Sequence, residues 1–357
     1  MDIALAKELT QAVGISGCEK YVSRILKKYY DVLTDEVVYD NLGGICAIKR
    51  CGKENAKKVL VVAHMDEVGM IVSDICDNGC LKFEIIGGIW NQNMLAQRVL
   101  LQNSDGKIFK GCIGSIAPHL LSEEVRNKPM DPKNMYIDLG FTCKQEVIDA
   151  GIRHNDPMVM DGPFEELNNG QRILAKAFDD RYGCILGVEL LRAVKDIQLD
   201  FDLYVAGSVQ EEVGLRGAST MTHLVNPDLA IVLDCSPAND YSTDKNIFGV
   251  LGKGVLVRFF DRGMLPNRTL INWYQDLMDK ANIKNQYYVS MGGTDAGVIH
   301  KSNDGIPTLT MCLCARNIHC SASIIDMNDY KCAYDALLLV MRELNGNLIE
   351  DFKRENQ

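Results

Sequence analysis

Five strand-like segments of the sequence each lead, at or soon after their ends, to side chains that can bind a metal ion. These side chains are His64 and Asp66 after residues 59–63, Asp179 and Asp180 after 173–178, Glu211 and Glu212 after 203–209, Asp234 after 229–233, and His319 after 308–313. A set of imidazole and carboxylate groups without a thiolate suits Zn²⁺ or Co²⁺. The sequence therefore indicates chemistry that depends on a divalent metal ion.

Each of these residues also has a structural explanation when it is taken alone. A single histidine after a strand is more often structural than functional, and adjacent carboxylates such as Glu211 and Glu212 are commonly solvated. Asp179 and Asp180 ahead of a helix would make a good N-terminal cap. The coincidence of five such positions favours one shared site, because ligands of open α/β sheets bind at the carboxyl ends of the strands.

Strand-like and helical segments alternate over most of the chain, which predicts an α/β fold. The continuous apolar runs at 59–63 and 229–233 are typical of strands buried on both faces of a parallel sheet. Helical patterns cover residues 5–30, with a break at 14–17, and then residues 183–196, 267–282 and 328–345. We expect a mostly parallel mixed sheet flanked by helices.

Residues 69–165 have a different texture from the rest of the chain. Their strand-like pieces are short and are separated by turn signals, such as Asp77-Asn78-Gly79 and Ser104-Asp105-Gly106. We interpret this stretch as a small, β-rich, barrel-like domain inserted into the main one. Residues 1–68 and 166–357 would then form the catalytic domain, and 69–165 would serve dimerisation or assembly.

Composition excludes several other classes of protein. The 357 residues carry a net charge of −10 with no basic block, which argues against a nucleic-acid partner. No apolar run approaches the ~18 residues of a membrane span, and the first residues do not resemble a signal peptide. The 13 cysteines include no CxxC pair. We interpret them as reduced thiols of a cytoplasmic protein.

The order of short motifs resembles one family over nearly the whole chain, the aminopeptidases with two metal ions. That family includes glutamyl aminopeptidases, deblocking aminopeptidases and the tetrahedral (TET) particles, and some of its members carry an endoglucanase label. The motifs are Gly14-Ile15-Ser16-Gly17, Asn41-Leu42-Gly43-Gly44, His64-Met65-Asp66-Glu67-Val68-Gly69, Pro118-His119-Leu120, Lys176-Ala177-Phe178-Asp179-Asp180-Arg181, Gln210-Glu211-Glu212-Val213-Gly214, Gly292-Gly293-Thr294-Asp295-Ala296-Gly297 and Ala315-Arg316-Asn317-Ile318-His319.

The resemblance implies a zinc-peptidase-like fold and a site for two divalent metal ions, zinc or cobalt, with manganese as an alternative. His64, Asp179 and Asp234 would hold one ion, and Asp179, Glu212 and His319 would hold the other. Glu211 would be the general base that takes a proton from a water shared by the ions. Asp66 would orient the imidazole of His64.

The resemblance also implies peptide substrates, cleaved at their N-termini, and self-association into a tetrahedral dodecamer built from dimers. It would place the 292–297 segment, with Asp295, beside the active site. For that segment a turn capped by Asp295 is the alternative, and for His119 a loop position without a role in the site.

Three other functions remain open at this point. A glycosidase needs two carboxylates about 5–9 Å apart across one bond. Glu211 and Glu212 fit this poorly if they lie on an extended segment, where neighbouring side chains point apart. A non-catalytic interaction protein would have no need of the full set of ligands. A related carboxypeptidase or deacylase with two metal ions is not excluded by composition.

The chain departs from the family pattern after the last proposed ligand. The family usually has His-Ser-Pro-x-Glu there, whereas this chain has His319-Cys320-Ser321-Ala322-Ser323. Without the proline we expect a freer loop, and without the glutamate a weaker partner for the imidazole. The ion held by Asp179, Glu212 and His319 would then bind more weakly, unless Asp326 supplies the missing carboxylate.

Overall fold

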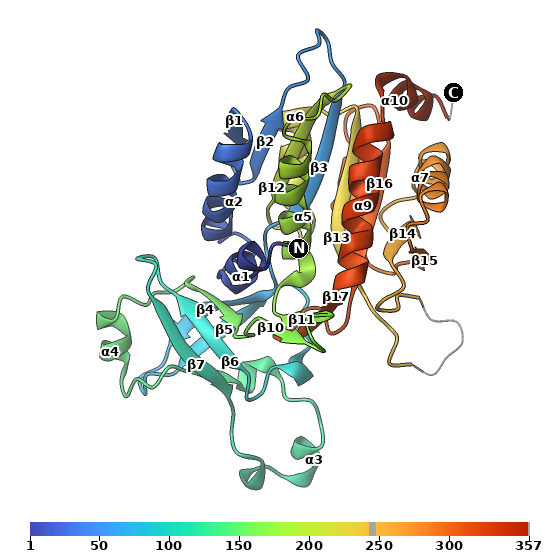
Figure 1. The fold of residues 1–357 in the computed structure, drawn as a ribbon. Coiled ribbons are helices and arrows are strands. Elements are labelled where there is room, and N and C mark those ends of the chain that lie inside the picture. The colour runs from blue at the N-terminus through green and yellow to red at the C-terminus, as the bar shows by residue number, and fades with distance from the viewer. Residues whose placement is uncertain (243–247, 356–357) are drawn as a thin grey trace.

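A computed structural model describes residues 1–242 and 248–355 and contains two clearly different parts (Figure 1). One is a large twisted sheet with helices on both faces, and the other is a closed β-barrel below it. This confirms the predicted α/β class with a barrel-like unit within the chain. Among the described residues, no helix is long and apolar enough to cross a membrane.

The large sheet has eight strands. In spatial order they are β1 (Glu36–Tyr39), β2 (Ile45–Lys49), β12 (Asp202–Ser208), β3 (Lys58–His64), β13 (Leu229–Pro237), β16 (Thr308–Ala315), β14 (Val255–Phe260) and β15 (Asn285–Val289). Four of the seven pairings are parallel, and three of these join the central strands β12, β3, β13 and β16. The carboxyl ends of these four strands therefore meet at one edge of the sheet.

Strand β3 shows why the central strands are apolar throughout. Val59, Val61 and Ala63 lie in the hydrophobic core on one face of the sheet, and Leu60 and Val62 lie in a second core on the other face. The first core is covered by α1 (Ile3–Gln11), α2 (Lys20–Leu33), α5 (Phe178–Val194), α7 (Arg268–Lys280), α9 (Met327–Glu343) and α10 (Gly346–Lys353). The second core is covered by α6 (Arg216–Val225) and α8 (Ala296–Ile299).

The barrel is closed by six strands and has a hydrophobic core of its own. Its order is β4 (Gly69–Ile75), β5 (Leu81–Ile86), β8 (Tyr136–Asp138), β7 (Ile108–Gly114), β6 (Arg98–Gln102) and β9 (Pro157–Met160). Its connections carry η1 (Asn91–Asn93), η2 (Pro118–Leu120), α3 (Glu123–Arg126), η3 (Pro132–Asn134) and α4 (Lys144–Asp149). The connection from β7 to β8, with α3, projects away from the barrel (Figure 1).

One predicted strand belongs elsewhere. Residues 173–178 were expected to bring Asp179 to the edge of the main sheet from a strand of their own. Instead β11 (Arg172–Ala175) pairs with β10 (Glu165–Leu167) and β17 (Ser323–Asp326) in a separate antiparallel sheet. Asp179 comes to the site from the start of helix α5.

A buried group of charges fixes the loop after β3. Arg181 is fully buried and donates hydrogen bonds to the backbone oxygens of Met65, Leu9 and Gly14 at 2.6, 2.5 and 3.0 Å. Glu67 accepts from Lys176 Nζ at 2.7 Å and lies 3.3 Å from Arg181. These contacts bind the loop after β3 to the end of α1 and to the start of α5, which are the segments around the proposed metal ligands.

Candidate metal centre

The predicted ligands converge at the carboxyl edge of the central strands. His64 ends β3, Asp234 lies near the end of β13, and Glu212 follows β12. The structure brings together two groups of possible metal ligands, and within each group one ligand atom per residue lies within 4.8 Å of the others. The groups are His64, Asp179 and Asp234, and Asp179, Glu212 and His319. Asp179 belongs to both.

The two carboxylate oxygens of Asp179 face different imidazoles. Oδ1 lies 3.1 Å from Nε2 of His64, and Oδ2 lies 3.3 Å from Nε2 of His319. Glu212 Oε1 lies 3.3 Å from the same nitrogen of His319, yet it is buried and has no hydrogen-bond partner. The two atoms approach each other without hydrogen-bond geometry, as neighbouring ligands of one ion do. The donor atoms present therefore fit a pair of divalent ions.

Both histidines are held in the orientation that a metal ligand needs. Nδ1 of His64 lies 3.0 Å from the backbone oxygen of Asp66, and Nδ1 of His319 lies 3.0 Å from the backbone oxygen of Gly88. A carbonyl oxygen can only accept, so Nδ1 carries the proton in the neutral ring. Each Nε2 then presents its lone pair toward Asp179, which is the usual arrangement of metal-bound histidine.

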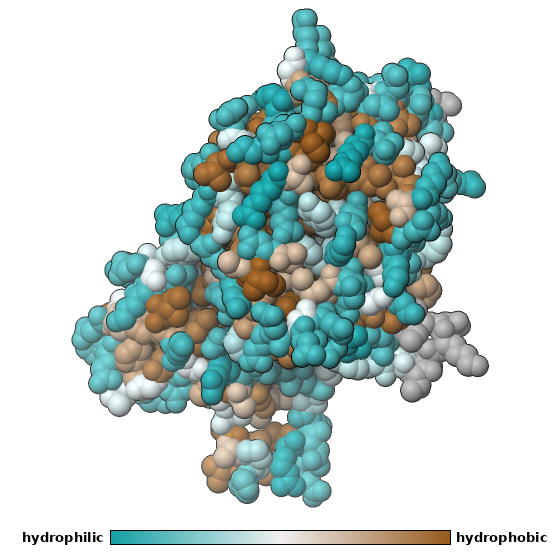
Figure 2. Space-filling view, viewed as in Figure 1, coloured by the Kyte–Doolittle hydropathy of each residue, from teal (hydrophilic) through white to brown (hydrophobic). Residues whose placement is uncertain are grey.

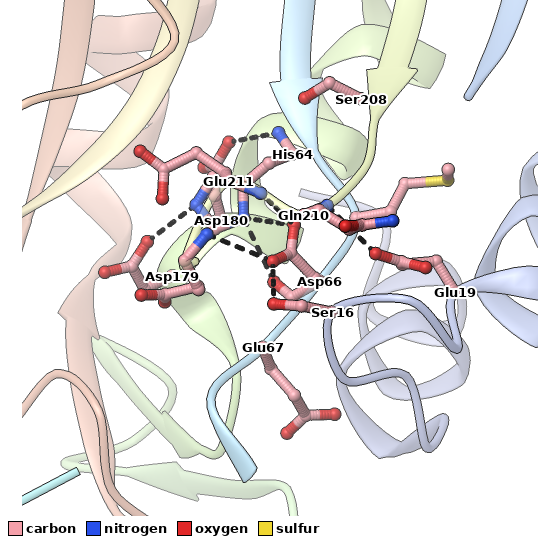
Figure 3. A network of polar contacts seen from close by, with 12 residues as sticks. Ser16, Glu19, His64, Asp66, Glu67, Asp179, Asp180, Ser208, Gln210 and Glu211 are labelled. Carbon is pink, nitrogen blue, oxygen red and sulfur yellow. Dashed lines mark hydrogen bonds and ion pairs between the residues drawn. The ribbon is translucent and has the colours of Figure 1, made fainter. Parts of the chain in front are cut away.

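Asp66 holds the neighbouring glutamates more than it holds His64 (Figure 3). Its carboxylate accepts hydrogen bonds from the backbone N–H groups of Glu211 and Glu212 at 3.0 and 3.1 Å, and from Ser16 Oγ at 2.6 Å. It lies 3.4 Å from Nδ1 of His64. The expected extended segment is wrong, because Glu211 and Glu212 stand in a turn closed from Gly214 N–H to Glu211 O.

Two buried carboxylates hold the backbone of the site although the sequence assigned neither of them a specific role there. Asp180 accepts from the backbone N–H of His64 at 3.1 Å and fixes the end of β3. Glu19 accepts from the N–H of Gln210 at 2.9 Å, where the backbone has a φ of 56° just before the glutamates. For Asp180 the sequence did offer a signal, because it directly follows the proposed ligand Asp179. No motif singled out Glu19, whose partner is a distant backbone atom.

The charges of the site repel one another unless a cation lies among them. Burial raises the pKa of Asp234 well above its usual range, and the nearby Asp179 adds to the effect. Burial and the carboxylates of Asp234 and Asp295 likewise raise the pKa of Glu211. Burial opposes a charge on His319, but Asp179 and Glu212 outweigh it and raise its pKa to about 11. In the absence of a metal ion, protons take the place of its charge.

A cavity of about 770 Å³ opens beside the two groups of ligands. Gly292 and Gly293 lie in its wall, as expected for the 292–297 segment. The side chain of Asp295 makes no capping hydrogen bond to helix α8, so a turn capped by its carboxylate is not what the structure shows. The buried Asp295 instead accepts from Ser208 Oγ at 2.5 Å, at the end of β12.

Two further residues considered in the sequence lie in other contexts. His119 lies in η2, on the projecting connection of the barrel. Asp326 accepts from Asn328 N–H as the N-cap of α9 and pairs with Arg172. In the described part of the chain, Asp326 therefore serves the helix and not the imidazole of His319.

The fold and this cluster of possible ligands are those of a protein with an α/β core that could hold divalent metal ions. The family model of the M42 glutamyl aminopeptidases matches residues 43–335. The glutamyl aminopeptidase of Lactococcus lactis subsp. cremoris is 36% identical over 97% of this chain and 98% of its own length. The chain belongs to the M42 family and is an aminopeptidase, as the motifs predicted.

Solved structures agree with the family assignment. The TET aminopeptidase of a marine sediment archaeon, Thaumarchaeota archaeon SCGC AB-539-E09, superposes with a TM-score of 0.94 at 36% identity, covering 98% of this chain and 99% of that one. The TET1 peptidase of Pyrococcus horikoshii, which can assemble into a tetrahedron or a large octahedral shell, has a TM-score of 0.86 at 28% identity, covering 96% and 99%.

A first prediction concerns metal binding to the folded chain. Adding Zn²⁺ or Co²⁺ to metal-free protein should raise the thermal unfolding midpoint. The free energy of unfolding should gain about 2.7 kcal/mol when the free ion is at 100 times its Kd. The gain should shrink as the pH falls, because the raised pKa of Asp234 means that protons compete with the ion. Differential scanning calorimetry checks both. His64→Gln should lose most of the gain and the exposed His223→Gln none; equal gains in the two variants would contradict this site.

Proposed function

We propose that the chain removes N-terminal residues from peptides with two divalent metal ions, zinc or cobalt, held side by side. His64, Asp179 and Asp234 would hold one ion, and Asp179, Glu212 and His319 would hold the other. The observation that carries the proposal is the pair of Asp179 oxygens, at 3.1 and 3.3 Å from two different imidazoles. A carboxylate placed in this way can belong to two ions at once.

The reaction would divide between the ions and Glu211. When bound, two such ions supply Lewis-acid polarisation of the scissile carbonyl and a water of lowered pKa. Glu211 is half-buried, lines the cavity and faces the site from the turn that Asp66 holds. Burial raises its pKa, which makes its carboxylate a better proton acceptor. It takes the proton of the attacking water and delivers it to the leaving amine nitrogen.

The two adjacent glutamates should therefore respond differently to the same substitution. Glu211→Gln should keep the metal content and lose about 10²–10⁴-fold in kcat, because the proton acceptor is gone while the ligands stay. Glu212→Gln should lose the ion of one site. Metal analysis after dialysis, beside kcat with an aminoacyl arylamide, checks both. Loss of metal in Glu211→Gln with full metal in Glu212→Gln would reverse the two roles.

The cavity favours a substrate with an acidic first side chain. Among the described residues that line it, Arg258 is the only lysine or arginine. Arg258 is 3% exposed, donates from Nη2 to Gly292 O at 2.8 Å, and its Nε lies 3.1 Å from Oδ2 of Asp261. A guanidinium is well suited to bind a carboxylate. The Lactococcus relative is a glutamyl aminopeptidase, which agrees with this preference.

Replacing Arg258 should change the choice of substrate. Arg258→Ala should lower kcat/KM for a glutamyl arylamide about 10–100-fold, from the loss of a charged hydrogen bond, and change the leucyl arylamide much less. Arg258→Lys should retain part of the preference. The exposed Arg262→Ala is the control. An equal loss on both substrates would mean that Arg258 only supports the loop at Gly292.

The chain should also self-associate, as a dodecamer built from dimers that encloses the active sites, with residues 69–165 as an inserted domain at the contacts. The projecting connection of the barrel supports this, because it exposes Ile116, Leu120 and Val125 to 54%, 79% and 49%. Figure 2 shows hydrophobic residues on this lobe. The TET1 peptidase of Pyrococcus horikoshii can assemble into a tetrahedron or a large octahedral shell. Thiols that are all free in the structure support a reducing, cytoplasmic location.

Assembly can be tested at Leu120, the most exposed large hydrophobic residue of the projecting connection. Leu120→Asp should shift the mass measured by light scattering from the oligomer toward dimers or monomers, because it places a charge in an apolar contact. Leu265→Asp, at a residue that is 73% exposed in another part of the molecule, is the matched control. A wild-type chain that remains a monomer at working concentration would refute the assembly.

A further inference from the structure

The loop that carries His319 rests on the barrel through three consecutive residues. Nδ1 of His319 contacts the backbone oxygen of Gly88 at 3.0 Å. Cys320 packs against the hydrophobic core of the barrel, and Ser321 Oγ donates to Gln97 Oε1 at 2.9 Å. The loop expected to be free is thus attached to a different part of the fold.

The contact with Gly88 depends on two glycines between β5 and η1. At Gly87 the backbone has a φ of +83°, and a Cβ there would lie 2.7 Å from Val68 Cγ1 and 3.3 Å from Glu212 Cβ. At Gly88 a Cβ would lie 3.2 Å from Nδ1 and 3.5 Å from Cε1 of His319. Glycine therefore lets the backbone of the barrel approach both ligands of one proposed ion closely.

The side chain at the position of the family glutamate does not serve the imidazole. Ser323 Oγ donates to the backbone oxygen of Arg316 at 3.2 Å. In the described part of the chain, the polar contacts of the His319 ring are therefore with Gly88, Asp179 and Glu212. The acceptor that orients this ring is a main-chain atom of the barrel.

We propose that Gly88 is a positioning residue for the ion held by Asp179, Glu212 and His319. Its carbonyl keeps the proton of the ring on Nδ1 and turns Nε2 toward Asp179, replacing the partner that the family motif would supply. The inference rests on the proposed function, because it presumes an ion at that site. It predicts that this ion, and not the one held by His64 and Asp234, depends on the geometry of the barrel.

The test is Gly88→Ala, which keeps the carbonyl but pushes the ring away by a few tenths of an ångström. Calorimetric titration of the metal-free protein with Co²⁺ should show one binding step unchanged and the other weakened about 10–100-fold, the usual cost of a disturbed partner of a metal ligand. The visible absorption of bound Co²⁺ should lose the contribution of the second equivalent. Neither readout requires catalytic activity.

Gly114→Ala is the matched control, because it makes the same change in barrel strand β7 where a Cβ meets no atom within 4 Å. It should titrate like the wild type, and both variants should unfold at the same temperature as the wild type when metal-free. If Gly88→Ala leaves both metal-binding steps unchanged, or weakens both equally, the proposed role of Gly88 is overturned while the two-ion function still stands. A wild-type chain that binds a single ion or none would instead overturn the proposed two-ion function.

Discussion

The carboxylate of Asp179 is the constraint around which the rest of the site is arranged. Its two oxygens face imidazoles that come from segments far apart in the sequence, His64 at the end of β3 and His319 after β16. Both rings must present Nε2 to one small group, so each needs an acceptor behind it at Nδ1. The structure provides a backbone carbonyl in each case. Side-chain freedom is thereby removed before any ion binds.

Holding so many carboxylates together has a cost that the fold must offset. Burial raises the pKa of Asp180, Asp234 and Glu211, which shows how unfavourable their charges are at these positions. The fold supplies donors where it can: the N–H groups of Glu211 and Glu212 point at Asp66, and the N–H of His64 points at Asp180. The remaining carboxylates lack enough donors, and divalent cations are the groups that can satisfy them.

The sequence was sufficient for the parts of the site that depend on strand order. Apolar runs such as 59–63 mark strands buried on both faces, and the parallel central strands put His64 and Asp234 at one edge. It was insufficient where the chain leaves the sheet. Asp179 arrives from the start of a helix, and the two glutamates stand in a turn, because distant acceptors such as Glu19 and Asp66 set the local backbone. Periodicity and propensity are local signals, so they do not register such partners.

In the segment after His319, local sequence signals also missed a distant partner, and here they predicted the loss of an interaction that the fold in fact supplies. Read as a motif, the absence of a proline and a glutamate indicates a loosened ligand. In the folded chain the ring has a carbonyl acceptor, Cys320 packs against an apolar core and Ser321 reaches Gln97. An acceptor made of main chain can be supplied by any residue type that allows the approach, and here glycine allows it. A motif records side chains only, so a missing side chain is evidence of a missing interaction only when the backbone around it is known.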